Sequence, residues 1–104
     1  MDFIFNLGRV YAMKNDYEKS LECFQKVLQS QPNDFDANLQ MGYLNFQAKK
    51  FKDAVTYFEK TTQIQPDNPD GWDGLYRTYA NLGDKAKATE AFEKTEALKK
   101  AKGQ

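Results

Sequence analysis

Apolar side chains recur along this chain at the spacing of an α-helix. Ile4, Leu7 and Tyr11 fall at i, i+3 and i+7, which places them on one face of a helix. Stripes of the same period run through residues 17–28 and 72–79. The pattern predicts an all-α protein with six main helices in antiparallel pairs and no strand.

Turn and capping residues fall between these stripes. Asn15 and Gly83 suit the left-handed residue that ends a helix, and Asp16 and Asp84 suit the N-cap of the helix that follows. Asp34 and Asn68 are further expected N-caps, and Pro69 is expected at a first helical position. The remaining turn, Lys49-Lys50, has neither a Gly or Asn nor an Asp, so it is predicted to be the weakest junction.

The first helix of a pair carries a second apolar stripe, formed by Phe3 and Val10 near the start and by Met41, Leu44 and Ala48 further along. A helix that is apolar on two sides is expected to be buried on both. Such a helix would lie between its own partner and the neighbouring pair. Gly8 and Gly42 are expected where two helices approach too closely for a side chain.

The sequence repeats itself every 34 residues. Phe24 recurs as Phe58 and Phe92, and Pro32 recurs as Pro66. Three units of residues 1–34, 35–68 and 69–102 follow one another without insertion, within a single expected domain of residues 1–104. A fixed period of this size indicates stacked copies of one supersecondary unit. One continuous core is expected, through Leu7, Tyr11, Phe24, Phe58, Trp72, Leu75, Tyr79 and Phe92.

These units resemble the tetratricopeptide repeat (TPR), whose signature is W-x₂-L-G-x₂-Y followed by Ala, Phe and Pro at set offsets. The first unit matches at Leu7, Gly8, Tyr11, Phe24 and Pro32, the second at Gly42, Ala54, Phe58 and Pro66, and the third at Trp72, Leu75, Tyr79, Ala88 and Phe92. Asn38, Asn45 and Tyr76 depart from it at the Trp, Tyr and Gly positions.

The resemblance implies a right-handed α-solenoid of three helix-turn-helix units that binds a protein or peptide in a concave groove and catalyses nothing. First-helix positions used by neither packing stripe are expected to line this groove. They are Asn6, Arg9, Met13, Gln40, Tyr43, Gln47, Asp73, Arg77 and Asn81. Phe5, Leu39 and Gly74 occupy further such positions, but Phe5 and Leu39, like Phe46, fit packing better. Arg9 and Arg77 fit ion pairs with Asp36 and Asp73 equally well.

One TPR function is not expected. The chaperone-binding members of the family hold a C-terminal carboxylate with Lys, Asn and Arg side chains. The corresponding positions here are Phe5, Arg9, Gln40, Asp70 and Gly74. Only Arg9 suits the role and Asp70 would repel a carboxylate, so the C-terminal tails of heat-shock chaperones are not expected as partners.

Charge and composition exclude other classes. Fifteen Lys and Arg balance fifteen Asp and Glu with no basic face, which argues against a nucleic-acid partner. No apolar run approaches the roughly 20 residues of a membrane span, and a cytoplasmic protein without membrane contact is expected. The chain has no histidine and one cysteine, Cys23. This removes histidine-based catalysis and cysteine-rich metal sites, so neither enzyme activity nor a cofactor is expected.

An alternative function concerns the two ends of the array. The last helix, expected from about Lys85 to Lys102, would leave Phe92, Leu98 and Ala91 partly uncovered, because terminal units normally need a polar cap. The chain is then a self-associating assembly piece, or a fragment of a longer array. A homo-oligomer through the terminal repeats is expected in the first case, with Phe92 and Leu98 in the contact.

Overall fold

The computed structural model describes residues 2–102; Met1, Gly103 and Gln104, part of the predicted domain, lie outside this range. Within it, six helices and no strand are present, which confirms the predicted class. The helices are α1 (Asp2–Met13), α2 (Tyr17–Ser30), α3 (Phe35–Gln47), α4 (Phe51–Ile64), α5 (Pro69–Leu82) and α6 (Lys85–Ala101).

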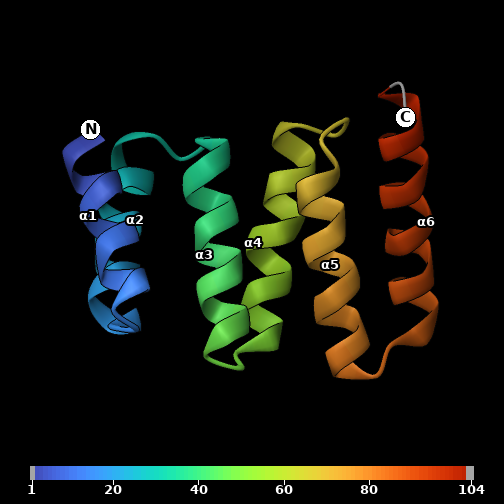
Figure 1. Cartoon of the computed structure of the whole chain (residues 1–104), viewed down its shortest axis with the longest axis horizontal. Coiled ribbons are helices and arrows are strands. Elements are labelled where there is room, and N and C mark those ends of the chain that lie inside the picture. Colours follow the sequence, from blue (N-terminus) through green and yellow to red (C-terminus); the bar gives the residue numbers. More distant parts are fainter. Residues whose placement is uncertain (1, 103–104) are drawn as a thin grey trace.

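The helices stand side by side in chain order, and consecutive helices run in opposite directions (Figure 1). Each helix packs against the next, and α3 also contacts α5 directly. The second helices α4 and α6 make no comparable contact and are joined through α5. The chain therefore folds as an α-solenoid of helix pairs.

All the predicted N-caps form. The Asp34 carboxylate accepts a hydrogen bond from the Ala37 amide at 2.8 Å, and the Asn68 side chain accepts one from the Asp70 amide at 2.9 Å. Asp16 and Asp84 cap α2 and α6 in the same way. Lys50 precedes α4 without any side-chain cap.

The three turns within the helix pairs share one backbone shape. Asn15, Lys49 and Gly83 each have a positive φ, of 64°, 64° and 80°. Asparagine and glycine tolerate this left-handed conformation, whereas lysine has no side chain suited to it. The middle turn thus lacks both stabilising features of its counterparts, as predicted.

Phe24 and Phe58 are fully buried, at 0% exposure. The predicted single core is nevertheless wrong, because the buried residues form two clusters, one around Phe24, Met41 and Leu44 and one around Phe58 and Leu75. Leu7 and Tyr11 are only half-buried. Phe92, also placed in this core, is 43% exposed, because no helix covers the outer side of α6 among the described residues. This confirms the other expectation, that the last helix leaves Phe92 partly uncovered. Ala91, expected to be partly uncovered, is buried.

Glycines allow the close packing around Phe58. A Cβ atom would lie 2.6 Å from the Phe58 ring if added at Gly42, and 2.4 Å from it if added at Gly74. The first contact confirms the close approach predicted at Gly42, and Gly8 approaches Phe24 similarly. The second corrects the placement of Gly74, which faces the core and not a groove.

The second apolar stripe is buried only where a preceding unit covers it. Met41 and Leu44 of α3 are 1% and 4% exposed, as predicted for a helix packed on both sides. Phe3 and Val10 of α1 are 76% and 44% exposed, contrary to that prediction. The difference arises because α3 packs against α2, whereas no described helix lies on that side of α1.

One departure from the repeat pattern, Asn38, is accommodated by a hydrogen bond. Trp72 Nε1 donates to the Pro66 carbonyl at 3.0 Å. Asn38, at the equivalent position, donates from Nδ2 to the Pro32 carbonyl at 3.1 Å. Asn38 therefore keeps the bond that ties a first helix to the preceding linker, although it lacks the indole ring.

Candidate functional site

The nine predicted groove residues lie on the three first helices, three on each. All are exposed or half-buried, as residues that contact a partner must be. Met13 is the most open of the hydrophobic ones, at 81% exposure. No hydrogen bond, ion pair or ring contact joins the three residues on α1 to α3 or α5 within residues 2–102, so the structure brings together only part of the set.

The groove residues on α3 and α5 lie on two helices that pack against each other. Arg77 Nε donates to Asp73 Oδ2 at 2.9 Å, one turn away on the same helix. Asn81 Nδ2 donates to the Arg77 carbonyl at 2.8 Å. The Tyr43 ring on α3 packs edge-on against Phe58, with ring centroids 5.0 Å apart. We call the four polar side chains of these two packed helices the α3–α5 cluster: Tyr43, Asp73, Arg77 and Asn81.

Charged side chains of α5 affect the pKa of the Tyr43 hydroxyl. Burial raises the pKa of Tyr43 above its ordinary value of 10.0, the negative charges of Asp73 and Asp70 raise it further, and Arg77 opposes them. The hydroxyl therefore stays protonated and remains a donor at neutral pH. The cluster presents a phenol, a guanidinium, a carboxylate and an amide on adjacent helices.

Several assignments to packing are confirmed. Phe5 packs edge-on against Phe24 at 5.2 Å, Leu39 is buried, and Phe46 packs against the cluster around Phe58. Of the two possible ion pairs, that of Arg77 with Asp73 forms. Arg9 has no carboxylate within ion-pair distance among the described residues, so it is not neutralised by Asp36. Cys23 is buried, in keeping with a structural thiol.

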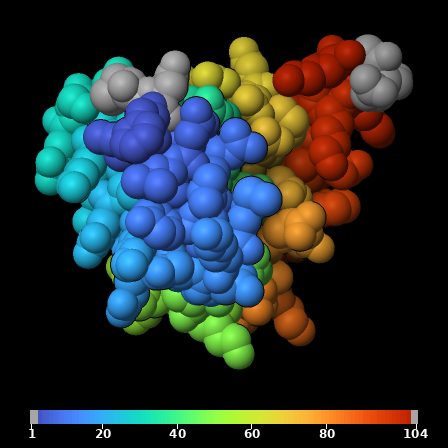
Figure 2. All heavy atoms as spheres, turned by 60° about the vertical axis from the view of Figure 1, so that its left-hand side comes forward, coloured from blue at the N-terminus to red at the C-terminus, as the bar shows by residue number. Residues whose placement is uncertain are grey.

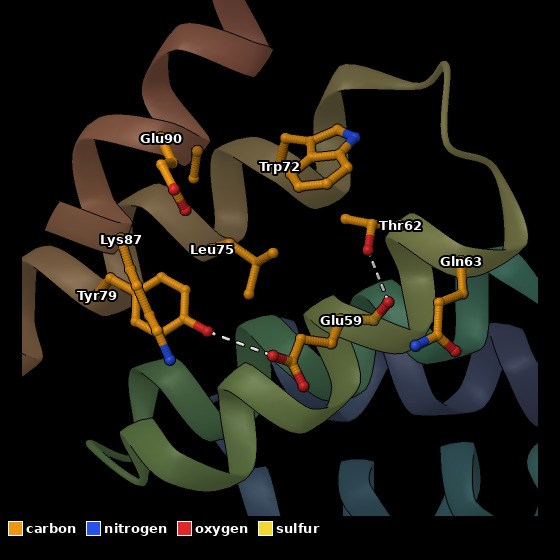
Figure 3. Close-up of a pocket in the computed structure, with 9 residues that line it drawn as sticks. Glu59, Thr62, Gln63, Trp72, Leu75, Tyr79, Lys87 and Glu90 are labelled. Atoms are coloured by element: carbon orange, nitrogen blue, oxygen red, sulfur yellow. Dashed lines mark hydrogen bonds between the residues drawn. The ribbon is translucent and has the colours of Figure 1, made fainter. Parts of the chain in front are cut away.

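A pocket of about 400 Å³, which the sequence pattern did not predict, lies between α4, α5 and α6 (Figure 3). It is lined by Glu59, Thr62, Gln63, Trp72, Leu75, Tyr79, Lys87, Glu90 and Ala91. Trp72 and Tyr79 had been assigned to the core, and both are half-buried with part of the ring in the pocket. The charged residues lie on the second helices α4 and α6, whereas the predicted groove positions all lie on first helices.

Charged groups surround the two rings of this pocket. The Tyr79 hydroxyl donates to Glu59 Oε2 at 3.3 Å, and the Lys87 ammonium lies 5.5 Å from the centre of the Tyr79 ring (Figure 3). Burial raises the pKa of Tyr79, and the charges of Glu59, Asp84 and Glu90 raise it further. Three carboxylates therefore act on the Tyr79 hydroxyl.

A related pocket of about 330 Å³ lies one unit earlier, with Leu21, Gln25, Met41, Asn45, Lys50, Asp53, Thr56 and Tyr57 around it. Gln25, Asn45 and Thr56 precede Glu59, Tyr79 and Glu90 by 34 residues. The repeat therefore builds both hollows, but only the later one holds the aromatic pair and two glutamates.

A third pocket, of about 440 Å³, opens on the outer side of α5 and α6. It is lined by Tyr76, Ala80, Lys85, Ala88, Thr89 and Phe92. The Tyr76 and Phe92 rings pack with centroids 5.1 Å apart. Leu98, the other residue predicted to self-associate, is half-buried and does not line this pocket.

Comparisons with known proteins agree with this architecture. Family models for the tetratricopeptide repeat match residues 2–34 and 35–68. Superkiller protein 3 of Schizosaccharomyces pombe is 27% identical over 99 residues, which cover 88% of this chain and 7% of that protein. Cellulose synthase operon protein C of Pseudomonas fluorescens is 31% identical over 98 residues, which cover 91% of this chain and 7% of that protein. The chain thus spans a small fraction of either relative.

Solved structures show the same fold. MamA superposes with a TM-score of 0.92 at 19% identity, over 95% of this chain and 58% of MamA. PcrH, solved in complex with the chaperone binding region of PopD, superposes with a TM-score of 0.92 at 17% identity, over 96% of this chain and 75% of PcrH. None of the described helices is long and apolar enough to cross a membrane.

Proposed function

This chain belongs to the tetratricopeptide repeat family, and we propose that it is an adaptor that holds a peptide segment of a partner protein on its first helices. The family model matches and the fold support a protein-interaction module in general. The finer proposal is that residues 1–104 act as one domain of three repeats, and that the peptide contacts the nine groove residues, centred on the α3–α5 cluster.

The arrangement of Tyr43 and Arg77 carries this proposal. The two side chains come from different repeats, yet the charge of Arg77 acts on the Tyr43 hydroxyl. Tyr and Arg are frequent anchors of protein interfaces, and amides such as Asn81 can pair with a peptide backbone in either sense. PcrH, which has the same fold, was solved with a segment of PopD.

The test is a selection of peptides on the wild-type protein from a random display library, followed by calorimetry of the selected peptides with variants. Arg77→Glu should weaken binding at least tenfold, because it places a second carboxylate beside Asp73. Tyr43→Phe removes the hydroxyl but keeps the ring on Phe58, so its effect reports binding and not folding. Lys26→Glu, an equal charge reversal on exposed α2, is the matched control.

Selected peptides whose affinity is unchanged by Arg77→Glu and by Tyr43→Phe would contradict this site. An equal loss of affinity for Lys26→Glu and Arg77→Glu would contradict it too, because the effect would then be one of net charge alone.

A second function, end-to-end assembly of copies, is favoured by the two end faces. The N-terminal face consists of Phe3, Leu7 and Val10, and α1 lies at the front of Figure 2 with no other helix before it. The C-terminal face consists of the residues that line the third pocket, including Phe92. The positions equivalent to Val10 and Phe92 within the array, Leu44 and Phe58, are 4% and 0% exposed.

An internal contact provides a pattern for how the end faces could be covered in this proposal. Phe58 is enclosed because Gly74 of α5, the first helix of the next pair, packs directly on its ring. A second copy's α1 placed against α6 would cover Phe92 as α3 covers Phe24, with Asn6 at the position of Gln40, and would bury Val10. Such a head-to-tail contact leaves one face of each type free and can repeat without closing.

Sedimentation over a hundredfold concentration range should then show a mass that rises with concentration. Phe3→Glu disrupts the N-terminal face and Phe92→Glu disrupts the C-terminal face, so each variant alone should be monomeric. An equal mixture should form dimers only, because each variant keeps the face that the other has lost. Met13→Glu places the same charge at a groove position and should leave the assembly unchanged. A wild-type monomer throughout, or self-association of Phe92→Glu alone, would contradict the head-to-tail contact.

A further inference from the structure

The pocket between α4, α5 and α6 combines two aromatic rings with two carboxylates. Trp72 and Tyr79 come from α5, Glu59 from α4 and Glu90 from α6, and all four line one space of about 400 Å³. We propose that this pocket binds an arginine side chain of a partner protein. None of the nine groove residues lines it within the described chain, so the site is separate from the proposed groove.

The rings of this pocket already attract cations. The Lys87 ammonium lies 5.5 Å from the centre of the Tyr79 ring, and the Lys94 ammonium lies 5.7 Å from that of Trp72. Both distances are within the roughly 6 Å at which a cation is attracted by the face of a ring. Two lysines of the chain thus already lie near these rings, at the distance that we expect for a partner's cation.

The net charge of the lining is negative. Glu59 and Glu90 carry two negative charges and Lys87 carries one positive charge, while the other lining residues are neutral. No ion pair joins Lys87 to either glutamate among residues 2–102. Glu59 Oε2 accepts the Tyr79 hydroxyl, which leaves its other oxygen for a ligand. Neither carboxylate is therefore held in an ion pair by a lysine among the described residues.

Arginine fits this combination better than lysine does. Its guanidinium is planar, stacks on aromatic faces and donates to carboxylates through several N–H groups at once. The space is at the low end of the roughly 300–1,000 Å³ range of ligand pockets, which suits one side chain. In Figure 3 Glu59 extends from α4 and Glu90 from α6, with Leu75 of α5 between them.

The equivalent pocket one unit earlier serves as an internal comparison. Its lining holds one Lys and one Asp, Lys50 and Asp53, so its net charge is zero. Asn45 stands where Tyr79 stands, and Gln25 and Thr56 replace the two glutamates. The same backbone hollow without these groups is not expected to bind arginine.

Trp72 is the only tryptophan of the chain, so its indole N–H signal reports this pocket directly in NMR. The probe is N-acetyl-arginine amide, and N-acetyl-citrulline amide is its neutral counterpart. We expect the arginine compound to shift the Trp72 signal with a dissociation constant on the order of 1 mM, as befits a ligand of about 15 heavy atoms. The citrulline compound should shift it at least tenfold more weakly.

Glu59→Gln with Glu90→Gln should weaken the arginine response at least tenfold. Glu93→Gln with Glu96→Gln removes the same charge from exposed positions of α6 outside the pocket and should change it less than twofold. Lys87→Met should strengthen binding, because the competing internal cation is gone. Arg77→Glu, the groove variant, should leave the titration unchanged, so the two proposals fail independently.

Equal responses to arginine and citrulline, or equal losses for the two double variants, would overturn the proposal. A lack of any Trp72 shift at 20-fold the expected constant, about 20 mM, would overturn it as well. Because Glu59 and Glu90 are exposed, a circular dichroism spectrum identical to wild type is expected for these variants.

Discussion

At the scale of single residues, the turn between α3 and α4 is the least favourable of the three turns within the pairs. Lys49 has a φ of 64°, where asparagine and glycine stand in the equivalent turns. Lys50 provides no side-chain cap for α4, whereas Asp16 and Asp84 accept hydrogen bonds from the amides of Lys19 and Lys87. The same backbone shape is thus formed with poorer local support.

Lys50→Asp should therefore stabilise the protein. An aspartate at an N-cap is worth about 1 kcal/mol relative to a residue that cannot cap. Urea unfolding should show this gain for Lys50→Asp and almost none for Lys50→Ala, which removes the same positive charge without adding an acceptor. Equal stabilities of the two variants would mean that the α4 N-terminus is satisfied in another way.

Two tyrosines make stability depend on alkaline pH. Burial first, and nearby carboxylates second, raise the pKa of Tyr43 and Tyr79 in the folded state above 10.0. The unfolded chain then releases these protons at lower pH than the folded chain does. Their contribution to stability is complete below pH 10 and is lost as the pH rises through the folded-state pKa.

Tyr43→Phe should make this loss of stability at alkaline pH smaller. Because phenylalanine does not titrate, the fall in the free energy of unfolding between about pH 9 and 11 should be smaller than in wild type. The measurement is urea unfolding at several pH values. An unchanged slope would show that the Tyr43 hydroxyl is as free to ionise in the folded chain as in the unfolded one.

At the scale of elements, one repeat position is buried in two units and exposed in the third. Phe24 and Phe58 are 0% exposed, whereas Phe92 on the last helix is 43% exposed. Gly42 and Gly74 enclose the Phe58 ring from two first helices, while Tyr76 stands at the position of Gly42 one unit later. Identical residues at identical slots therefore contribute unequally, according to how many helices surround them.

Phe58→Ala should cost about 3–5 kcal/mol, the range for a fully buried phenylalanine. Phe92→Ala should cost less than half of that, because much of its ring remains in water when the chain folds. Urea melts of the two variants provide the comparison. Equal losses would show that Phe92 is covered in solution, as it would be in the end-to-end assembly.

At the scale of the whole molecule, stability is expected to vary along the array. In a solenoid each unit contacts only its neighbours, so inner helices gain interfaces on both sides. Here α3 packs against α2, α4 and α5, whereas α1 packs mainly against α2 and α6 against α5. In addition, α3 contributes residues to both buried clusters, Leu39 to one and Met41 and Leu44 to the other.

Hydrogen exchange should reflect this gradient. Amides in the middle of α3 and α4 should exchange slowest, and those of α1 and α6 should be faster by about tenfold or more, because end units open without the rest. Exchange measured at a concentration where the protein is monomeric excludes protection by assembly. Uniform protection from α1 to α6 would mean that the array unfolds as one cooperative unit.

The sequence by itself determined the helices, their N-caps and the turns within each pair. These features depend on local chemistry: the period of apolar residues, the capping side chains and the residues that accept a positive φ. The 34-residue repeat then indicated how successive pairs stack. Family membership followed from the same positions, including the departures at Asn38 and Tyr76.

Only the tertiary structure decided which faces are covered and which groups meet. Phe3, Val10 and Phe92 occupy core positions of the repeat but are exposed, because burial depends on a neighbouring helix and not on the residue. Gly74 was expected in the groove, yet it packs on Phe58 of the preceding unit. The pocket between α4, α5 and α6 is lined by side chains of three helices. The spacing of residues along one helix does not give the distance between side chains on different helices, so the sequence pattern could not predict this pocket.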